Sequence, residues 1–556
     1  MATNDMLNLG FKVSIGKSGT TAEGRRYVEL CIRKDKIRSR KMFPIDELAK
    51  SDGALYLAWL AELCIPLISR KLRTAAINKL QELLSKNLRA SNTMVVEGPG
   101  WAKGVFVTKY RPHCPAGVQV LRAVALSSER PVEVSQARLR RALRRYGNGN
   151  ALVKFAFCVG LAGPVLEFAE FTELPFFLFV GPSSTGKSSL LKVAASCSGG
   201  PRSGMLGALS SLSSTTNNAE LNGLNARDLL VAYDDLQALP ADRGKRAADF
   251  HNLLFRTVAG RERGRMGAST REWRTVFMAA SNQPLAQLMG EGSIHFDDAT
   301  RVRAVEIQCQ RKFGVFDRVP EDTGAAEFVK GAVRTFERYR GVSGERFAAG
   351  IVRDREKSEA KLRKRVRAYV DEFVGQAMPD HTSGGVERRI LEKIGLIYAA
   401  GRLAGRYGIS PWRKENLMKA MLVVAGQCGL EHRSTAATSS AGKRLAAYIC
   451  RHQKSFPTVR EGKPAEAACL AVDALGVRYR RDGRQVEFCF TDAQLARVYP
   501  GERLSSVLRE LFADGLLTVD GSEKSKMRPK RRLVLGQRAR YICVNGTAIA
   551  ELARSI

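Results

Sequence analysis

The spacing of hydrophobic residues changes several times along the chain. In the first 30 residues, FKVSIG and RRYVELCIRK alternate apolar and polar side chains, which predicts strands with one buried face. From residue 46 to about 88 the apolar residues recur at helical spacing, and the stretch MVVEGPGWAKGVFVTKY that follows alternates again. We therefore expect an N-terminal α+β domain over residues 1–145 that admits DNA or supports oligomerisation. It ends in RLRRALRR, a helix that fits a solvated surface as well as a nucleic-acid contact.

The middle of the chain carries continuous apolar runs instead of alternating ones. They are FFLFV, LLVAY, VFMAA and AVEI, which begin at residues 176, 229, 276 and 304. Strands that are buried on both faces have this pattern, and they occur in parallel sheets covered by helices. We expect an α/β core over residues 146–320, a helical lid region over 321–435 and a further domain over 436–556.

The first apolar run leads directly into the pattern GxxxxGK[ST], in the order strand, loop and helix. Glycines allow the backbone N–H groups of such a loop to surround phosphate oxygens, and the following helix points its positive end at them. Lys187 is expected to contact the β- and γ-phosphates, and the Ser188 hydroxyl to bind Mg²⁺. The sequence therefore predicts an ATP and Mg²⁺ site formed by Gly181, Pro182, Ser183, Ser184, Thr185, Gly186, Lys187, Ser188 and Ser189.

Two of the later runs end in polar residues that suit hydrolysis. The second run ends in Asp234 and Asp235, at the spacing of a Walker B strand. We expect Asp234 to hold Mg²⁺, and Asp235, in the place of the usual Glu, to polarise the attacking water. Without the loop at Gly181, two Asp residues at this point would indicate only an ordinary exit from a strand. Asn282 follows the third run and is expected to orient the lytic water.

Arginines lie before and after the third run. Residues 259–271, AGRERGRMGASTR, alternate Gly and Arg, which suits a projecting hairpin with a cationic tip or, alternatively, a solvated hairpin. The predicted DNA contacts in it are Arg261, Arg263 and Arg265. Arg303, just before the fourth run, is expected to reach the γ-phosphate held by a neighbouring subunit, which implies a ring or a dimer. That role fails if both Arg301 and Arg303 pair with acids of their own subunit.

The C-terminal part has the pattern of a winged helix. GKRLAAYIC, AQLARVY and residues 503–512 have helical spacing, and LLTVD and YICV resemble strands. Between these strands lies KSKMRPKRRLVLGQRAR, with eight positive residues and no acid. Such a loop is the wing that contacts phosphates, unless the domain binds protein and the loop is solvated. The predicted DNA contacts are Lys524, Lys526, Arg528, Lys530, Arg531 and Arg532.

Composition narrows the class of partner. The 90 Lys and Arg residues against 55 Asp and Glu give a net charge of +35, which favours a polyanion. Apolar runs such as residues 155–166 are shorter than the ~20 residues of a membrane span, and no secretory segment follows Met1. The 11 cysteines include no CxxC pair, which indicates buried thiols in a reducing, cytoplasmic compartment rather than a metal site.

Taken together, the motifs resemble one known family. FAFCVGLAGPVLEFAEFTELPFFLFVGPSSTGKSSLLKVAAS, LLVAYDDL, AGRERGRM and the strand after Arg303 look like the family called domain of unknown function 927. GWAKGVFV and LIYAAGRLAGRYGISPW look like further blocks of it, so the likeness runs from about Met94 to Val519. Its members are P-loop ATPases of prophages, plasmids and integrated mobile elements, and some are similar to the minichromosome maintenance helicases.

The resemblance implies an AAA+ core that assembles as a homohexamer. It supports the roles given above for Lys187, Ser188, Asp234, Asp235, Asn282 and Arg303, and it adds Arg389 as a second sensor arginine for the nucleotide. The family usually has Asp-Glu at the end of the Walker B strand. Asp235 departs from that pattern, and the departure bears on the rate of hydrolysis.

The expected function is an ATP-dependent helicase or translocase on single-stranded or forked DNA. It would be the hexameric replicative helicase of a phage, plasmid or integrated mobile element, with a primase or other replication protein as a candidate partner and no membrane. Two alternatives share every motif. One is a DNA-binding AAA+ ATPase that loads or remodels other proteins without unwinding, and the other is a slow nucleotide-gated binding switch.

Overall fold

Most of the chain is described by a computed structural model. The described residues are 9–50, 52–65, 67–87, 93–123, 132–199, 209–211, 216–234, 242–262, 271–291, 294, 296–378, 385–428, 441–464, 475–481, 485–499, 504–519, 528–534 and 537–554. They form two units, one with residues 1–284 and 298–428, the other with 285–297 and 429–556.

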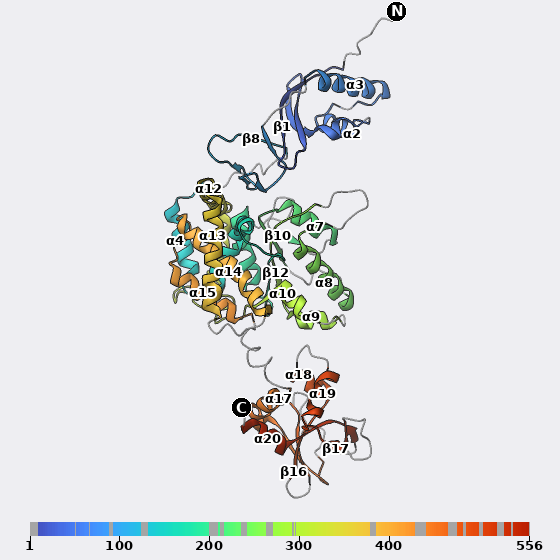
Figure 1. Ribbon diagram of the computed structural model, residues 1–556, viewed down its shortest axis with the longest axis vertical. Helices are drawn as coiled ribbons and strands as arrows, with labels where there is room; N and C mark the ends of the chain where they lie inside the picture. Colours follow the sequence, from blue (N-terminus) through green and yellow to red (C-terminus); the bar gives the residue numbers. More distant parts are fainter. Residues whose placement is uncertain are drawn as a thin grey trace, which may run out of the picture. The chain divides into compact units, whose positions relative to one another are not determined.

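The first unit begins with a five-stranded sheet in the order β3-β2-β1-β4-β8. Figure 1 labels β1 and β8 of this sheet. β1, β2 and β3 are antiparallel, and β4 joins β1 and β8 in parallel. The strands are β1 (Lys12–Thr20), β2 (Arg26–Lys34), β3 (Ile37–Pro44), β4 (Met94–Val96) and β8 (Val120–Arg122). Three helices contribute to its core, namely α1 (Ile45–Leu48), α2 (Ala54–Glu62) and α3 (Arg70–Asn87). Tyr56, Trp59 and Leu80 from α2 and α3 pack against Leu30 and other strand residues.

A small three-stranded sheet joins this part to the rest of the unit. It consists of β5 (Gly100–Ala102), β6 (Val105–Val107) and β7 (Pro112–His113). The Trp101 indole donates to the carbonyl of Pro164 at 3.0 Å. His113 lies 3.1 Å from Glu345, a buried carboxylate of the helix that follows residue 341. The GWAKGVFV block therefore packs on the central part of the first unit.

The centre of the first unit is an entirely parallel sheet in the order β10-β11-β12-β9-β13. Its strands are β9 (Phe176–Val180), β10 (Leu209–Ser211), β11 (Leu230–Asp234), β12 (Val276–Ser281) and β13 (Ala304–Gln308). All four apolar runs form strands of it. The mixed α/β fold with a parallel sheet agrees with the expected fold class.

Helices cover both faces of the parallel sheet. On one face Phe155 packs against Phe177 and Phe179, and on the other Phe250 packs against Phe176. Figure 1 shows helices on both sides of β12. The helices and the 3₁₀ helix of this part are α4 (Gln136–Gly147), α5 (Ala151–Ala162), η1 (Gly163–Phe168), α6 (Lys187–Ser198), α7 (Thr216–Asn225), α8 (Arg243–Ala259) and α10 (Asp298–Arg303).

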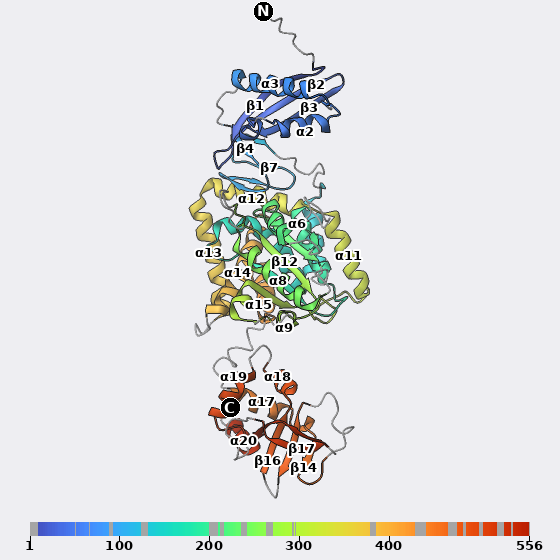
Figure 2. The same ribbon diagram turned by 90° about the vertical axis from the view of Figure 1, so that its right-hand side faces the viewer.

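Five longer helices follow β13. They are α11 (Ala325–Arg338), α12 (Val342–Lys357), α13 (Glu359–Ala377), α14 (Gly385–Arg406) and α15 (Lys414–Gly426) (Figure 2). α14 and α15 pack against α5, and α11 packs against α6. Tyr146 of α4 contacts Phe328 and Phe336 of α11, so α4 belongs to this part of the unit. The boundary expected at residue 145 therefore falls inside a helix.

One segment of the described residues is long and apolar enough to cross a membrane. It is Ala151–Phe168, which contains α5 and η1, and 94% of it is buried inside the protein. Phe155 and Phe157 in this segment pack against Phe177 and Trp412. The segment therefore forms part of the core.

The second unit contains α9 (Leu285–Glu291) and a C-terminal α/β part with the sheet order β14-β15-β16-β19. Thr491 caps α18 through a capping box. Leu517, in the expected strand LLTVD, makes only a single bridge to Val544. The described elements are α17 (Ala441–Arg451), η3 (Gln453–Ser455), β14 (Thr458–Arg460), β15 (Val477–Arg481), β16 (Gln485–Phe490), α18 (Asp492–Val498), α19 (Leu504–Ala513), β17 (Lys530–Val534), β18 (Gln537–Arg540), β19 (Ile542–Asn545) and α20 (Gly546–Arg554).

Candidate nucleotide site and nucleic-acid contacts

The loop between β9 and α6 has the backbone shape of a phosphate cradle. Ser184 and Gly186 adopt left-handed conformations, with φ of 62° and 100°. Gly186 is the N-cap of α6, so the positive end of this helix lies at the loop. Gly181 begins the loop, and its N–H donates to Ser281 at the end of β12 at 3.3 Å. The loop is therefore fixed to the carboxyl edge of the parallel sheet.

Lys187 is the first residue of α6, directly after this loop, and is only 6% exposed. Its ammonium group donates to the carbonyl oxygens of Gly181, at 2.8 Å, and Pro182, at 2.6 Å. These bonds compensate for the burial of the charge. They also hold the amine beside the backbone of the loop, where it would contact a bound phosphate.

Ser188 and Asp234 come from different ends of the predicted motif and meet in the structure. The Ser188 hydroxyl donates to the Asp234 carboxylate at 2.7 Å. Ser188 is in the first turn of α6, and Asp234 is the last residue of β11. A hydroxyl and a carboxylate in contact form an oxygen pair of the kind Mg²⁺ binds. The expected partner of Asp234 in hydrolysis, Asp235, lies outside the described residues.

Asn282 follows β12, which lies between β9 and β11 in the sheet. Parallel neighbouring strands end at one edge, so the residue lies between the loop at Gly181 and Asp234. The Asn282 side chain is exposed. The structure thus brings together at one sheet edge the loop, the Ser188 and Asp234 pair, and a solvent-facing amide.

Arg303 lies at the opposite edge of the same sheet. It is the last residue of α10 and directly precedes β13, whereas the loop follows β9, which runs parallel to β13. Its guanidinium pairs with Glu173 at 2.8 Å and lies over the ring of Phe255. Arg303 is therefore far from its own loop, and within a single chain it has an acidic partner.

Lys393 and Arg389 of α14 share this edge with Arg303. Lys393 is 2% exposed, and its ammonium group donates to the carbonyl of Val302 at 2.6 Å. Burial lowers the pKa of Lys393 to about 8. Arg389 is exposed and lies one helical turn before Lys393. The predicted second sensor thus lies near Arg303 and not beside Ser188.

The Arg-rich segment after α8 has the base of a hairpin. Arg261 and Glu272 form an antiparallel bridge, and the N–H of Glu262 donates to the carbonyl of Arg271 at 2.9 Å. Arg271 also pairs with the Glu262 carboxylate at 2.6 Å. Arg261 is exposed. Arg263 and Arg265, the other predicted DNA contacts, lie outside the described residues.

The basic C-terminal stretch differs from the expected loop. Lys530 and Arg532 belong to β17, which forms a hairpin with β18, and Lys524 and Lys526 lie outside the described residues. Arg528 is partly exposed and pairs with Asp492 at 2.9 Å. The structure corrects the prediction that Arg531 contacts DNA. It is 7% exposed and forms two hydrogen bonds with buried Glu487, so it stabilises the sheet.

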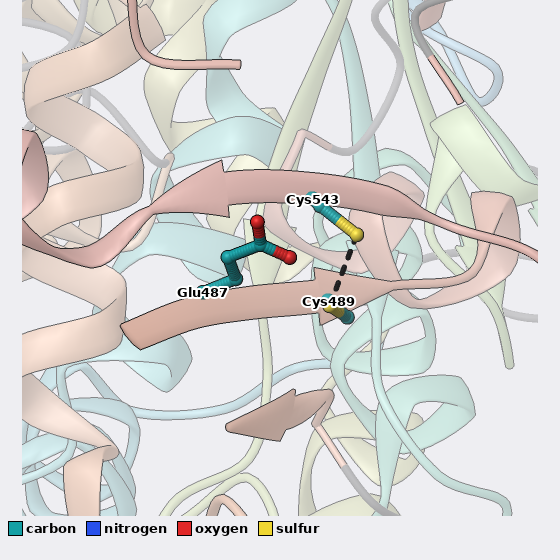
Figure 3. A group of neighbouring side chains, drawn as sticks. All are labelled: Glu487, Cys489 and Cys543. Atoms are coloured by element: carbon teal, nitrogen blue, oxygen red, sulfur yellow. Dashed lines mark hydrogen bonds between the residues drawn. The ribbon is translucent and has the colours of Figure 1, made fainter. Parts of the chain in front are cut away.

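Glu487 also lies beside two thiols. Figure 3 shows Cys489 and Cys543 facing each other from β16 and β19, and their sulfur atoms are 3.0 Å apart. The contact with Cys543, together with burial, raises the pKa of the Cys489 thiol well above its usual value. Three such groups within reach of one another resemble a metal site. However, both Glu487 oxygens already accept from Arg531, so this group serves as a core contact.

One buried polar group had no counterpart in the sequence analysis. Asp228, with no exposed surface, accepts from the N–H of Trp101 at 2.9 Å and from the guanidinium of Arg274 at 2.9 Å. Trp101 belongs to the GWAKGVFV block, and Asp228 directly precedes the second apolar run. A carboxylate just before a buried strand was a signal for this contact, but its partner 127 positions away was not visible in the sequence.

Comparisons with known proteins agree with the motifs. Residues 12–273 match the family described as domain of unknown function (DUF927). The match starts at residue 12 and includes the N-terminal sheet. The motifs quoted in the sequence analysis begin only at about Met94. It ends after the hairpin at Trp273 and does not extend to Val519.

The fold of this chain is similar to that of a solved structure described as "SCCmec type IV Cch - active helicase". The two chains share 16% sequence identity with a TM-score of 0.58, over 97% of this chain and 94% of the other. The similarity extends over nearly the whole of both chains and shows a common mixed α/β fold. No curated protein matches the sequence.

Proposed function

We propose that this chain is an ATP-hydrolysing AAA+ ring that moves along DNA and separates its strands. The observation that carries the proposal is the contact between Ser188 and Asp234. These residues are 46 positions apart, and they meet at the carboxyl edge of a parallel sheet beside a buried loop lysine. The similarity of fold to a structure described as an active helicase supports unwinding as the outcome. The same description names a mobile element, SCCmec, which supports the role of a replicative helicase in such an element.

The residues of the site have distinct roles in the proposed reaction. ATP with Mg²⁺ supplies the phosphoryl group that is transferred to water. Lys187 and the loop N–H groups bind the phosphates, and Ser188 and Asp234 hold the metal. Asp235 removes a proton from the attacking water and Asn282 orients it. An Asp in the position of the usual Glu has a shorter reach, so we expect slower turnover than a Glu would give.

The position of Arg303, at the edge of the parallel sheet opposite the phosphate loop, supports assembly into a ring. It cannot contact the phosphates of its own chain, so a catalytic role requires a neighbouring subunit. We propose that Arg303 leaves Glu173 when a neighbour presents its γ-phosphate, and that Arg389 approaches the same nucleotide. Closed symmetric rings arise from such head-to-tail contacts, and a homohexamer is the proposed form.

The proposed DNA contacts are the predicted cations other than Arg531. They include the hairpin based on Arg261 and Glu272 and the C-terminal winged-helix domain with Arg528. Binding at these positions neutralises phosphates and releases counterions, so it weakens steeply as salt increases. A primase remains a candidate protein partner.

The decisive experiment measures ATP turnover and separation of a forked DNA by the purified full chain with Mg²⁺. Substitution Lys187→Ala should reduce turnover by about 10²-fold or more, because the phosphates lose their charged donor. It should abolish unwinding. The matched control is Lys192→Ala, five residues later on α6, because Lys192 is partly exposed and pairs with Glu337. Normal unwinding by Lys187→Ala would contradict the proposal.

The same assay separates the alternatives. Rapid DNA-stimulated turnover without unwinding of any fork would indicate an ATPase that loads or remodels other proteins. Negligible turnover in the wild type, with a large gain in Asp235→Glu, would indicate a nucleotide-gated switch. For Arg303, rings of Arg303→Ala alone and of Lys187→Ala alone should be inactive, and mixing the two kinds of subunit should restore part of the hydrolysis, because the intact loop of one subunit then meets the intact Arg303 of the next. Normal hydrolysis by Arg303→Ala rings would exclude the role in the neighbouring site.

A further inference from the structure

The three antiparallel strands of the N-terminal sheet have one face packed on helices and one face exposed. Residues on the covered face, such as Leu30, Ile32 and Phe43, are buried against α2 and α3. Side chains alternate between the two faces of a strand. The positions between the buried ones therefore lie on the other face. Those that are exposed are Lys12, Ser14, Arg33, Arg38 and Arg40.

Cations form a row across this exposed face. Lys12 on β1 is directly opposite Arg33 on β2, and Arg33 is directly opposite Arg38 on β3. Arg40, two residues along β3, lies opposite Cys31. Like charges in directly opposed positions destabilise a sheet. The row therefore reduces the stability of the isolated sheet, which is a cost that a bound polyanion would remove.

Acids do not neutralise the row. Among the described residues, no carboxylate lies within 4.0 Å of the cationic nitrogens of Lys12, Arg33, Arg38 or Arg40. Glu29 is the acid nearest along β2 on this face, and its carboxylate accepts from the N–H of Lys17. By contrast, Lys41 on β3 pairs with Glu62. The charges of the row are thus available to a partner.

We propose that this face binds the phosphodiester backbone of nucleic acid, independently of the contacts at 261–271 and 524–540. The inference rests on the proposed function in that DNA is the expected polyanion. Neighbouring strands are ~4.8 Å apart, so the three cations span about 10 Å. That span equals about three steps of 3.4 Å between phosphates along one strand of a duplex, so each of the three cations can face a phosphate. The aromatic residue on this side of β2, Tyr27, is only 6% exposed and does not present its ring for stacking on bases, so binding is independent of sequence.

An anionic membrane surface fits this face less well. Binding in the plane of a membrane requires apolar side chains that enter the lipid beside the cations. The exposed large apolar residues among those described are Leu55, Ile68, Val118, Val132, Leu221 and Phe512. None of them lies on β1, β2 or β3. The face therefore offers charge without an apolar anchor.

The test compares two variants of the full chain that lose the same charge. The first is Lys12→Gln with Arg33→Gln and Arg38→Gln. Binding to labelled single-stranded DNA, duplex DNA and RNA is measured over a series of salt concentrations. The first variant should bind at least about tenfold more weakly at low salt. The slope of log K against log salt should fall by about 2, since up to three phosphate contacts are lost.

The matched control removes three lysines from the same part of the unit. Lys41, Lys79 and Lys86 are each paired with Glu62 or Glu82, so their charges are already compensated. Their replacement by Gln should change nucleic-acid affinity less than about twofold. Equal losses in both variants would overturn the proposal, because net charge and not the row would then explain the binding.

Further readouts separate this inference from the proposed function. DNA-independent ATP turnover should be unchanged in both variants, and unfolding temperatures no lower than that of the wild type would show that the sheet is intact. If the first variant unfolds, Arg38→Glu on the edge strand β3 replaces it, with the same expected loss of affinity. If both variants bind DNA as tightly as the wild type does, this inference is overturned and the proposed function is not. Binding lost only to anionic vesicles would show that lipid is the partner, and absence of all nucleic-acid binding would overturn the proposed function as well.

Discussion

The N-terminal sheet and the parallel sheet each have five strands, but their polar chemistry lies in different places. Helices cover both faces of the parallel sheet, and each residue of β9 is buried. Its polar groups therefore lie where the strands end, with Ser188 and Asp234 at one edge and Arg303 at the other. The antiparallel strands of the N-terminal sheet are covered on one face, and their cations lie on the other. The degree of burial thus determines whether a sheet can present a site at its edge or on its face.

The largest expected effect tests this contrast at consecutive positions. Leu178→Ala and Phe179→Ala in β9 should each lower the free energy of unfolding by about 3–5 kcal/mol, because both side chains are fully buried. In β2, Ile32→Ala should cost about 2–4 kcal/mol, but Arg33→Ala less than about 0.5 kcal/mol. Urea titrations that follow the transition of each sheet measure these values. A cost for Arg33→Ala as large as that for Ile32→Ala would show that the second face is covered.

A smaller effect is expected at the amino edge of the parallel sheet. Asp228→Asn should destabilise the protein by about 3 kcal/mol, since Arg274 then lacks one of its carboxylate partners and the N–H of Trp101 a charged acceptor. Glu23→Gln is the control, because Glu23 is exposed and 3.8 Å from Arg227. It should change stability by less than about 0.5 kcal/mol. Thermal unfolding of both variants decides whether this edge is structural.

The smallest effect concerns the row of cations itself. Arg38→Gln should raise stability by less than about 1 kcal/mol in low salt, because one opposed pair of like charges is removed. The gain should shrink as salt screens the exposed charges. Calorimetry over a salt series measures it, with Lys41→Gln as a control that should give no gain. A loss of stability in Arg38→Gln would show that the row has a partner within the protein.

The elements that could be predicted were those with strong local signals. The continuous apolar runs predicted four strands of the parallel sheet, and GxxxxGK[ST] predicted the loop between strand and helix. The loop and Asp234 could be placed at one edge because parallel strands share direction. The family resemblance was confirmed over residues 12–273.

The features that could not be predicted depend on contacts distant in sequence. Arg531 had the surroundings of a basic loop, and only the pairing of β16 with β19 and the position of β17 show that it reaches Glu487. The cationic row was equally hidden, because Lys12, Arg33 and Arg38 are opposed only when the register of β1, β2 and β3 is known. A charge count recorded these residues, but it could not show which were buried, paired or aligned.

The two hydrogen bonds of Lys187 to its own loop have a consequence for nucleotide exchange. Because the Lys187 amine already donates to the carbonyl oxygens of Gly181 and Pro182, it is not fully hydrated before a ligand binds. Phosphate binding then replaces carbonyl acceptors by phosphate oxygens, and little hydration of the amine must be removed. When the nucleotide leaves, the Lys187 amine again donates to the carbonyl oxygens of Gly181 and Pro182. We therefore expect the loop carbonyl oxygens to assist product release, because they replace the phosphate oxygens as hydrogen-bond acceptors for Lys187.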